Sequence, residues 1–226
     1  MARKKLVRFD DNLKMQCVFQ PSLDDSKNDQ FLLKGKWNSE FFKNDHPIVV
    51  ELGCGKGEYT VELAKKYPDK NFVGIDIKGA RIWYGAKAVT DLGLGNVAFV
   101  RGKIDMVNHF FAKDEIEEIW LTFSDPQPKK PSKRLSSKSF VALYRQFLKS
   151  GGIIHMKTDN TMLFEWTLEE ILKNDYALKI NSFDVYSDLK SGFDPKTCEL
   201  LQIQTHYQQL FTKRGFDIKY LSFSIS

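Results

Sequence analysis

The sequence predicts an α/β protein with a doubly wound, mostly parallel seven-stranded sheet, and three observations support this prediction. Short apolar runs alternate with helix-period segments from His46 to the end of the chain, as in βαβ units. The first run, Ile48–Leu52, is almost continuously apolar, as expected for a strand covered on both faces. Hydrophobic residues make up 42% of the 226 residues, which is enough apolar mass for the core of one domain.

The expected elements follow one another in a regular order. Five strands are predicted first, at residues 48–52, 71–76, 97–100, 118–123 and 152–156, and two further extended runs lie near Ile180 and at residues 218–221. A helix after the first strand ends before Pro68, because proline cannot continue a helix. Another helix-period segment runs from Phe140 to Leu148, with Gly151 and Gly152 as a C-cap, and a later helix covers residues 162–172.

The net charge of +5 is concentrated in two places. Residues 125–149 carry +6 and residues 1–10 carry +3, so the rest of the chain sums to −4. Residues 1–45 are polar, contain a turn-rich stretch at residues 21–26 and show no sustained period. We therefore expect a basic N-terminal arm over residues 1–45 and the folded domain over residues 46–226.

Several classes of protein are excluded by what the sequence lacks. No run of about 18 uncharged apolar residues is present to form a membrane-spanning helix. The basic first residues lead into no apolar segment, so we expect no secretory signal. Cys17, Cys54 and Cys198 cannot build a disulfide framework or a CxxC metal site, and the four histidines are scattered. We expect a cytoplasmic protein without a metal site.

A glycine-rich turn follows the first strand directly and opens a helix. Gly53, Gly55 and Gly57 let the backbone turn tightly and approach a ligand, and the helix N-terminus presents free N–H groups. The spacing is GxGxG rather than the GxGxxG of dinucleotide-binding proteins, and the acidic Glu51 lies two residues before the first glycine. A carboxylate at this point favours a cationic ligand over a pyrophosphate.

A second acid, Asp76, ends the second strand 25 residues after Glu51, where a carboxylate can accept the hydroxyls of a ribose. A nucleoside that has a positive charge and no phosphates fits both acids, and S-adenosylmethionine is such a ligand. We therefore predict S-adenosylmethionine as the cofactor. The alternative is a glycine turn used only for packing, with Asp76 as a solvated strand end.

The fourth strand ends in a Ser-Asp-Pro sequence that places Asp125 at the carboxyl end of the sheet, where open α/β sheets bind ligands. A basic loop containing Lys129, Lys133 and Arg134 follows at once. Beside a ligand cleft, such a loop favours a polyanionic partner, most simply nucleic acid, through phosphate contacts. The alternative is a solvated run of charges without a partner.

Taken in order, these segments resemble the bacterial tRNA (guanine-N7)-methyltransferase family, whose members are class I methyltransferases with a Rossmann-like fold. The resemblance covers residues 46–226 and rests on the stretches at residues 50–57, 74–77, 123–126, 133–134, 152–159 and 205–215. The basic loop with its Asp-Pro entrance carries it more specifically than the glycine loop does. It implies transfer of a methyl group from S-adenosylmethionine to N7 of a guanine in tRNA, guanine 46 of the variable loop, which forms 7-methylguanosine.

The resemblance also implies roles for individual residues. Asp125 would be the catalytic acid that faces the guanine. The cofactor site would be formed by Glu51, Gly53, Gly55, Gly57, Asp76, Lys103 and Asp125. Substrate contacts would come from Lys129, Lys133, Arg134, Asp159, Thr205 and Gln208.

This chain departs from the family pattern at three of these positions. Gln127 follows the Asp-Pro pair where the family often has Trp, and Gln208 replaces a late Glu. Lys103 aligns with an Asp that contacts the cofactor, although Asp105 lies two residues further on.

The expected chemistry needs positioning more than proton transfer. Guanine N7 has an in-plane lone pair and no proton, so no general base is required, and alignment of N7 with the methyl carbon lowers the barrier. A nearby carboxylate can accept the guanine N–H donors and offset the positive charge that develops on the base. Asp125 is the residue predicted to do both.

Two other interpretations stay open on the residues alone. The loop after the fourth strand loosely echoes the Asp-Pro-Pro-aromatic motif of amino-directed methyltransferases acting on nucleic acid or protein, but its second proline and its aromatic residue are misplaced. A non-catalytic RNA-binding relative is the other, encouraged by Gln127 and Gln208. The sequence leaves open whether the protein is a monomer or a homodimer.

Overall fold

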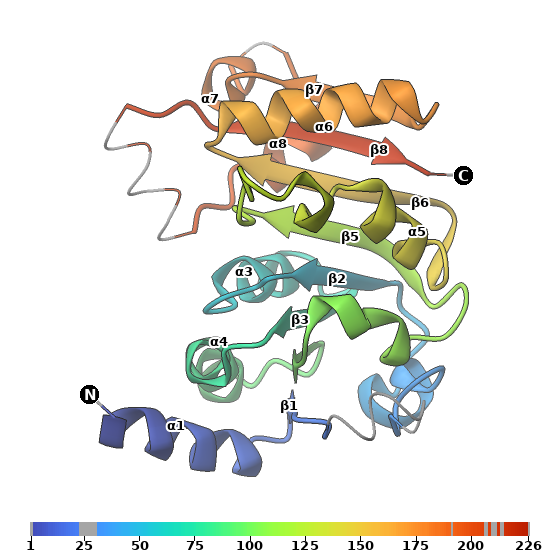
Figure 1. Ribbon diagram of the computed structural model, residues 1–226. Coiled ribbons are helices and arrows are strands. Elements are labelled where there is room, and N and C mark those ends of the chain that lie inside the picture. The colour runs from blue at the N-terminus through green and yellow to red at the C-terminus, as the bar shows by residue number, and fades with distance from the viewer. Residues whose placement is uncertain are drawn as a thin grey trace.

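The computed structural model describes residues 2–22, 31–190, 192–205, 208, 212 and 215–225, with side chains from residue 6 onward. Its centre is an eight-stranded sheet with the strand order β1-β4-β3-β2-β5-β6-β8-β7 (Figure 1). The strands from β1 to β6 are parallel to their neighbours, whereas β8 runs antiparallel to both β6 and β7. Because the winding reverses at β2, the predicted doubly wound α/β fold is confirmed.

The strands are β1 (Val18–Phe19), β2 (Ile48–Leu52), β3 (Asn71–Asp76), β4 (Val97–Arg101), β5 (Ile116–Thr122), β6 (Leu148–Thr158), β7 (Ala177–Ser182) and β8 (Lys219–Ser224). The α-helices are α1 (Ala2–Lys14), α3 (Glu58–Lys66), α4 (Gly79–Leu92), α5 (Lys138–Tyr144), α6 (Thr161–Lys173), α7 (Val185–Asp188) and α8 (Pro195–Leu201). The described residues also form three short helices of other types, the π-helical η1 (Trp37–Phe42) and the 3₁₀-helical η2 (Ile104–His109) and η3 (Pro131–Lys133).

Two details differ from the sequence prediction. The sheet has eight strands rather than seven, because Val18–Phe19 pairs with the edge of β4. The helix α5 ends at Tyr144 and does not extend to Gly151, because Leu148 already pairs with Ile116 as the first residue of β6. The predicted C-cap at Gly151 was therefore wrong: its φ of 76° serves the irregular stretch of β6 between two registers.

Alternation along the strands divides the core into two layers. Val50 and Leu52 pack in the layer that includes residues of α5 and α6, whereas Val49 packs in the layer of α3 and α4. Glu51 shares the face of Val49 and therefore points toward α3, where Thr60 binds it. The acid predicted to serve the cofactor thus lies on the α3 side of the sheet.

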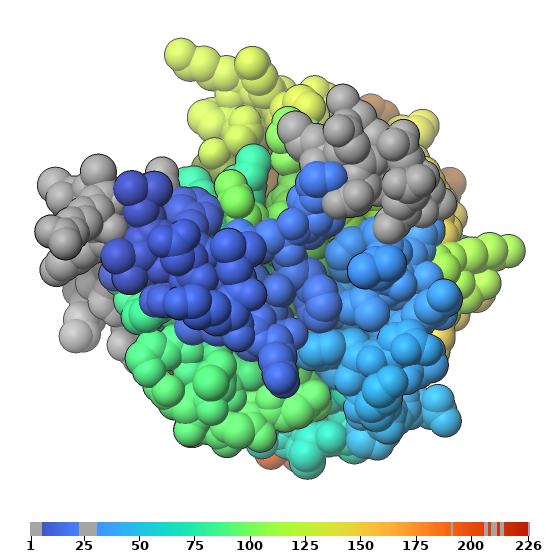
Figure 2. Space-filling model, turned by 90° about the horizontal axis from the view of Figure 1, so that it is seen from below, coloured from blue at the N-terminus to red at the C-terminus, as the bar shows by residue number. Residues whose placement is uncertain are grey.

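The N-terminal residues lie against α4. Figure 2 shows α1 in dark blue alongside the green residues of α4. Asn12 donates from Nδ2 to the carbonyl oxygen of Gly79 at 2.8 Å, and the Arg8 guanidinium lies over the rings of Trp83 and Tyr84 at 5.1 and 4.5 Å. The segment predicted as an arm is therefore joined to the sheet through α4 and through β1.

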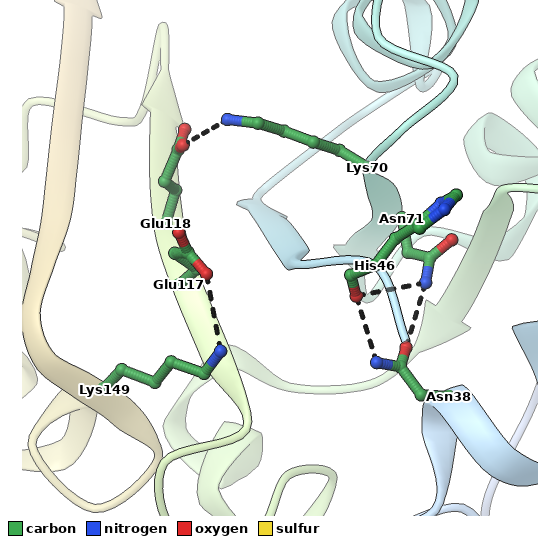
Figure 3. Close-up of polar contacts among 7 residues, drawn as sticks. All are labelled: Asn38, His46, Lys70, Asn71, Glu117, Glu118 and Lys149. Carbon is green, nitrogen blue, oxygen red and sulfur yellow. Dashed lines mark hydrogen bonds and ion pairs between the residues drawn. The ribbon is translucent and has the colours of Figure 1, made fainter. Parts of the chain in front are cut away.

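A partly buried group of charges lies near the amino end of β5. Lys70 Nζ is 2.6 Å from Glu118 Oε1 (Figure 3). On the other side of this carboxylate, His155 Nε2 is 3.4 Å from Glu118 Oε2. Burial alone would raise the pKa of Glu118, but the hydrogen bond and charge of His155 and the Lys70 ammonium outweigh it and lower the pKa to about 2. The neighbouring pair of Glu117 and Lys149, also drawn in Figure 3, is exposed.

The lowered pKa of Glu118 makes stability depend on pH in a defined direction. The ionised carboxylate stabilises the fold above about pH 4.5, and this contribution is lost as the pH falls toward about 2. We expect Glu118→Gln to lower the free energy of unfolding by about 2 kcal/mol at neutral pH, with a gap to the wild type that narrows in acid. Urea denaturation across this pH range measures it, and Glu117→Gln, in the exposed pair, should change stability by less than about 0.5 kcal/mol. A gap that does not vary with pH would contradict the expectation.

Candidate active site

Two adjoining hollows lie at the carboxyl ends of the central strands. The first has a volume of about 290 Å³ and contains Glu51 and Asp159, and the second has about 630 Å³ and contains Asp76 and Lys103. Hollows of this size suit nucleoside-sized ligands. The wall common to both is formed by Gly53, Arg81, Phe123, Ser124 and Asp125. The predicted cofactor acids and the predicted catalytic acid are therefore brought together in one cleft.

The glycine loop is fixed to β3 by its backbone. The N–H groups of Gly53 and Cys54 both donate to the carbonyl oxygen of Ile75, at 2.8 and 3.1 Å. Gly57 begins α3 with a φ of 71°, and a Cβ added there would lie 2.5 Å from the Phe99 ring. The spacing of the glycines thus serves close packing behind the loop, while Gly53 and Gly55 line the cleft in front of it.

The Glu51 carboxylate is buried beneath the first turn of α3, with 4% of the residue exposed. The backbone N–H of Thr60 donates to Oε2 at 2.9 Å, and the hydroxyls of Thr60 and Thr122 donate to Oε2 and Oε1. Burial raises the pKa of Glu51 to about 7, although these hydrogen bonds lower it in part. Near neutral pH this group is poised between its neutral and its charged form.

Asp76 connects the glycine loop with the start of α4. Its Oδ2 accepts the N–H of Gly55 at 3.0 Å, and its Oδ1 accepts the N–H of Lys78 at 2.7 Å. Each carboxylate oxygen has a second lone pair, and the half-buried side chain lines the larger hollow. The carboxylate is held by two backbone donors and can still accept ligand hydroxyls.

Asp125 stands on an exposed loop with an unusual backbone. Phe123 and Gln127 have φ angles of 48° and 43°, in the left-handed region that residues other than glycine rarely adopt. The N–H of Phe123 donates to the carbonyl oxygen of Lys157 at 2.8 Å, and the N–H of Gln127 donates to Asp125 Oδ1 at 3.0 Å. The loop therefore holds the carboxylate at the wall between the two hollows.

Arg134 lies inside the protein, not on the surface of the basic loop. It is 3% exposed, its Nε donates to the carbonyl oxygen of Pro126 at 2.9 Å, and its guanidinium lies 4.5 Å from the centre of the Trp166 ring. This position attaches the Asp125 loop to α6. It differs from the solvent-facing position that a phosphate contact requires.

The other predicted basic residues are distributed around the cleft. Lys133 and Lys103 both line the larger hollow, where Lys133 Nζ lies 3.8 Å from Asp105 Oδ2. Lys129 is exposed but lines neither hollow.

The predicted late residues separate in the structure. Thr205 lines the smaller hollow together with Asp159. Gln208 is fully buried, donates from Nε2 to Tyr186 Oη at 2.8 Å and lines neither hollow. His206, residue 207 and residues 209–211 lie outside the described residues.

Sequence reasoning missed three residues of the site. Thr60 and Thr122 bind Glu51, but a threonine in a helix turn or at a strand end carries no signal of such a contact. Arg81, in the first turn of α4, lines both hollows and is exposed. Its guanidinium makes no hydrogen bond or ion pair with any residue that the structure describes. A basic residue a few positions after Asp76 was the only available hint.

The described ranges lack two features that would point to other functions. They contain no group of three or more His, Cys, Asp or Glu side chains that could hold a metal ion. They also contain no helix long and apolar enough to cross a bilayer.

Solved structures with this arrangement are methyltransferases. The 16S rRNA methyltransferase KamB matches 83% of this chain and 91% of its own with a TM-score of 0.61 at 14% identity. A protein described as an antibiotic-related methyltransferase covers the same shares with a TM-score of 0.60 at 15% identity. At such low identity the likeness concerns the fold alone. Residues 45–221 match the family model described as "Putative methyltransferase". The chain is therefore a methyltransferase of the Rossmann-like class.

Sequence relatives narrow this class to one family. The tRNA (guanine-N(7)-)-methyltransferase of Christiangramia forsetii is 47% identical over 226 residues, which cover 99% of each chain. The protein of the same name from Bacteroides fragilis is 48% identical over 99% of this chain and 86% of its own, and that of Clostridium acetobutylicum is 38% identical over 83% and 85%. The chain belongs to the tRNA (guanine-N(7)-)-methyltransferase family.

The raised pKa of Glu51 predicts a second dependence of stability on pH, opposite in sign to that of Glu118. The folded protein holds a proton on Glu51 that the unfolded chain releases, so wild-type stability falls as the pH rises from about 4.5 to about 7. Glu51→Gln does not titrate. We expect the stability of this variant relative to wild type to increase by about 2 kcal/mol across that window. Urea denaturation without ligand measures it, with Glu62→Gln in an exposed pair as the control. A constant difference would refute the assignment.

Proposed function

We propose that this protein transfers the methyl group of S-adenosylmethionine to N7 of a guanine in tRNA and forms 7-methylguanosine. The observation that carries the proposal is the common wall of the two hollows, where Asp125 stands between the predicted cofactor acids and the basic loop. Membership of the family and the names of the relatives support the same reaction. The resemblance in sequence points to guanine 46 of the variable loop as the target.

The residues of the cleft fit S-adenosylmethionine. Asp76 has free lone pairs for ribose hydroxyls, and Ile77 and Ile104 give the larger hollow an apolar side for an adenine. Glu51 is a buried acid whose charged form a cationic ligand favours. When bound, the cofactor supplies the methyl group on a positively charged sulfur. Glu51, the glycine loop and Asp76 would hold it in place.

The role proposed for Asp125 follows from the chemistry of guanine. N7 has no proton to lose, so the protein must orient the base, exclude water and tolerate a positive charge on the product. A carboxylate at the wall between the hollows can accept N–H groups of the base and stabilise that charge. The hydrogen bond from Gln127 to Oδ1 orients the carboxylate while leaving Oδ2 available.

The proposed tRNA contacts lie on both sides of the cleft. Lys129 and Lys133 stand on the basic loop, and Arg81 stands on α4 at the common wall. Exposed cations at such positions would bind phosphates and make the affinity for RNA depend on salt. Because Arg134 is buried, we assign it the task of holding the Asp125 loop.

An assay of methyl transfer tests the function directly. Unmodified tRNA and labelled S-adenosylmethionine are incubated with the protein, and 7-methylguanosine is mapped by borohydride and aniline cleavage. Strand cleavage at one guanine of the variable loop is the expected result. Methylation of an exocyclic amine, seen by nucleoside mass spectrometry, would identify an amino-directed enzyme. Binding of tRNA without turnover would indicate a non-catalytic relative.

Replacement of Asp125 tests its proposed role. We expect Asp125→Ala to lower kcat/KM for tRNA methylation by about 10²- to 10³-fold, because the base loses its orienting acceptor and the product charge loses its partner. The affinity for S-adenosylhomocysteine, measured by calorimetry, should change much less. Asp69→Ala, at an exposed turn residue that lines neither hollow, is the control. Near-normal kcat/KM in Asp125→Ala would sink the assignment.

Replacement of Arg81 tests the phosphate contact. We expect Arg81→Gln to weaken tRNA binding and to reduce the slope of log affinity against log salt by about 0.7 to 0.9, the value for one lost contact. Lys87→Gln is the matched control, since Lys87 lies on the same helix, pairs with Asp91 and lines neither hollow. An unchanged salt slope, or a loss confined to cofactor affinity, would place Arg81 on the cofactor instead.

A further inference from the structure

Lys157 lies at the carboxyl end of β6, beside the cleft. It is a fully buried lysine that the proposed chemistry does not use. It belongs to β6 and lies two residues before Asp159, and its residue exposure is 0%. Its carbonyl oxygen accepts the N–H of Phe123 at the base of the Asp125 loop. The main chain of this residue is thus already part of the support of the site.

The side chain of Lys157 reaches across to a different segment. Its Nζ donates to the carbonyl oxygens of Leu201 and Ile203, each at 2.9 Å, and lies 5.4 Å from the centre of the Tyr59 ring. Tyr59 lines the smaller hollow and donates from Oη to the carbonyl oxygen of Leu200 at 3.4 Å. Two neighbouring side chains from the body of the domain therefore hold three carbonyls of one short segment.

That segment leads directly into the cleft wall. Leu201 ends α8, and from there the buried residues Leu201, Ile203 and Thr205 alternate with the exposed Gln202 and Gln204. The segment is not a strand of the sheet, so no neighbouring strand satisfies these carbonyls. Thr205, two residues beyond the second carbonyl, lines the smaller hollow with Glu51 and Asp159.

Burying the Lys157 amino group costs free energy of desolvation. We take this cost as an argument that the side chain has a specific role. Transfer of an ammonium group out of water without a carboxylate partner is unfavourable, and burial lowers the pKa of Lys157 to about 7. The structure describes no carboxylate in an ion pair with Nζ. A methionine of similar length would pack in the same space but would leave the two carbonyls unsatisfied.

We propose that Lys157 is a positioning residue that fixes the 201–205 segment through its two carbonyls and thereby sets Thr205 in the wall of the cofactor site. The effect on the cofactor rests on the proposed function, whereas the anchoring of the segment does not. Lys157 acts through this segment and not by contact with the ligand. Tyr59 supports it, since its ring lies near Lys157 Nζ and its hydroxyl donates to the carbonyl oxygen of Leu200.

Two measurements on Lys157→Met test the proposal. Hydrogen exchange of the ligand-free protein should be faster in a peptide covering residues 199–205 and unchanged in β2 and β3. The Kd for S-adenosylhomocysteine, measured by calorimetry, should rise about tenfold, because the wall is displaced when two hydrogen bonds are lost. If the wild type itself fails to bind S-adenosylhomocysteine, the proposed function fails, and the exchange experiment still tests the anchoring.

Two control variants separate positioning from general stability. Lys66→Met removes a half-buried lysine that donates to the carbonyl oxygen of Glu199 in the same region. Lys70→Met removes a half-buried ion pair with Glu118 at the other end of the sheet. Both should leave the Kd within about twofold of wild type, even where Lys70→Met lowers the melting temperature as much as Lys157→Met does.

Three results would overturn the proposal. The first is wild-type exchange over residues 199–205 in a folded Lys157→Met protein, and the second is faster exchange with a Kd within about twofold of wild type. Should Lys157→Met fail to fold, Lys157→Gln, which keeps an N–H donor, is measured in its place with an expected rise of about three- to fivefold. The third result that would overturn the proposal is failure of both variants to fold, because Lys157 would then be needed for folding and not for positioning.

Discussion

The buried carboxylate of Glu51 is the constraint around which the cleft is organised. An unpaired carboxylate at this depth would be strongly unfavourable, so the chain must bring donors to it from elsewhere. They come from the first turn of α3, through Thr60, and from the end of β5, through Thr122. Because α3 begins where the glycine loop ends and the Asp125 loop begins where β5 ends, one acid sets the relative positions of both loops. The geometry of the cleft is in this sense a consequence of satisfying a single buried group.

Several further polar side chains lie on the same face of the sheet. Along β5 and β6, Glu118, Thr122, His155 and Lys157 all point toward the side of α3, two or four residues apart on each strand, whereas Ile119, Leu121, Ile154 and Met156 point to the layer that holds α5 and α6. Ile119, Leu121, Ile154 and Met156 thus belong to an apolar cluster that stabilises the domain. The α3 side of the sheet contains polar groups with specific partners, and these place the elements that surround the cleft.

Local patterns in the sequence were sufficient for the fold and for part of the site. The bounds of β2 and β3, the glycine loop and the position of Asp125 follow from apolar runs and from glycine and proline spacing, all of which are short-range signals. The pairing of Val18–Phe19 with β4 was missed because a two-residue strand has no periodicity to detect. Arg134 and Gln208 could not be placed because a charged or polar residue reads as solvent-exposed until its tertiary partners, Pro126 and Tyr186, are known. The partners of Glu51 depend equally on contacts between distant segments.

The seating of α1 has a consequence for how the N-terminus of this protein can be handled. The Phe9 ring lies where a Cβ on Gly79 would be 2.7 Å away, and Asn12 binds the carbonyl of that glycine, the first residue of α4. The backbone N–H of Lys78, the residue before Gly79, donates to Asp76, and Arg81 lies two residues after Gly79. Removing the first fourteen residues would therefore do more than remove basic side chains. It would also expose the N-terminal end of α4, which lies next to Asp76, the acid proposed to bind the ribose. Helix α1 therefore supports the start of α4 beside the binding site. A fusion partner attached to α1 would act on an element that contributes to this support.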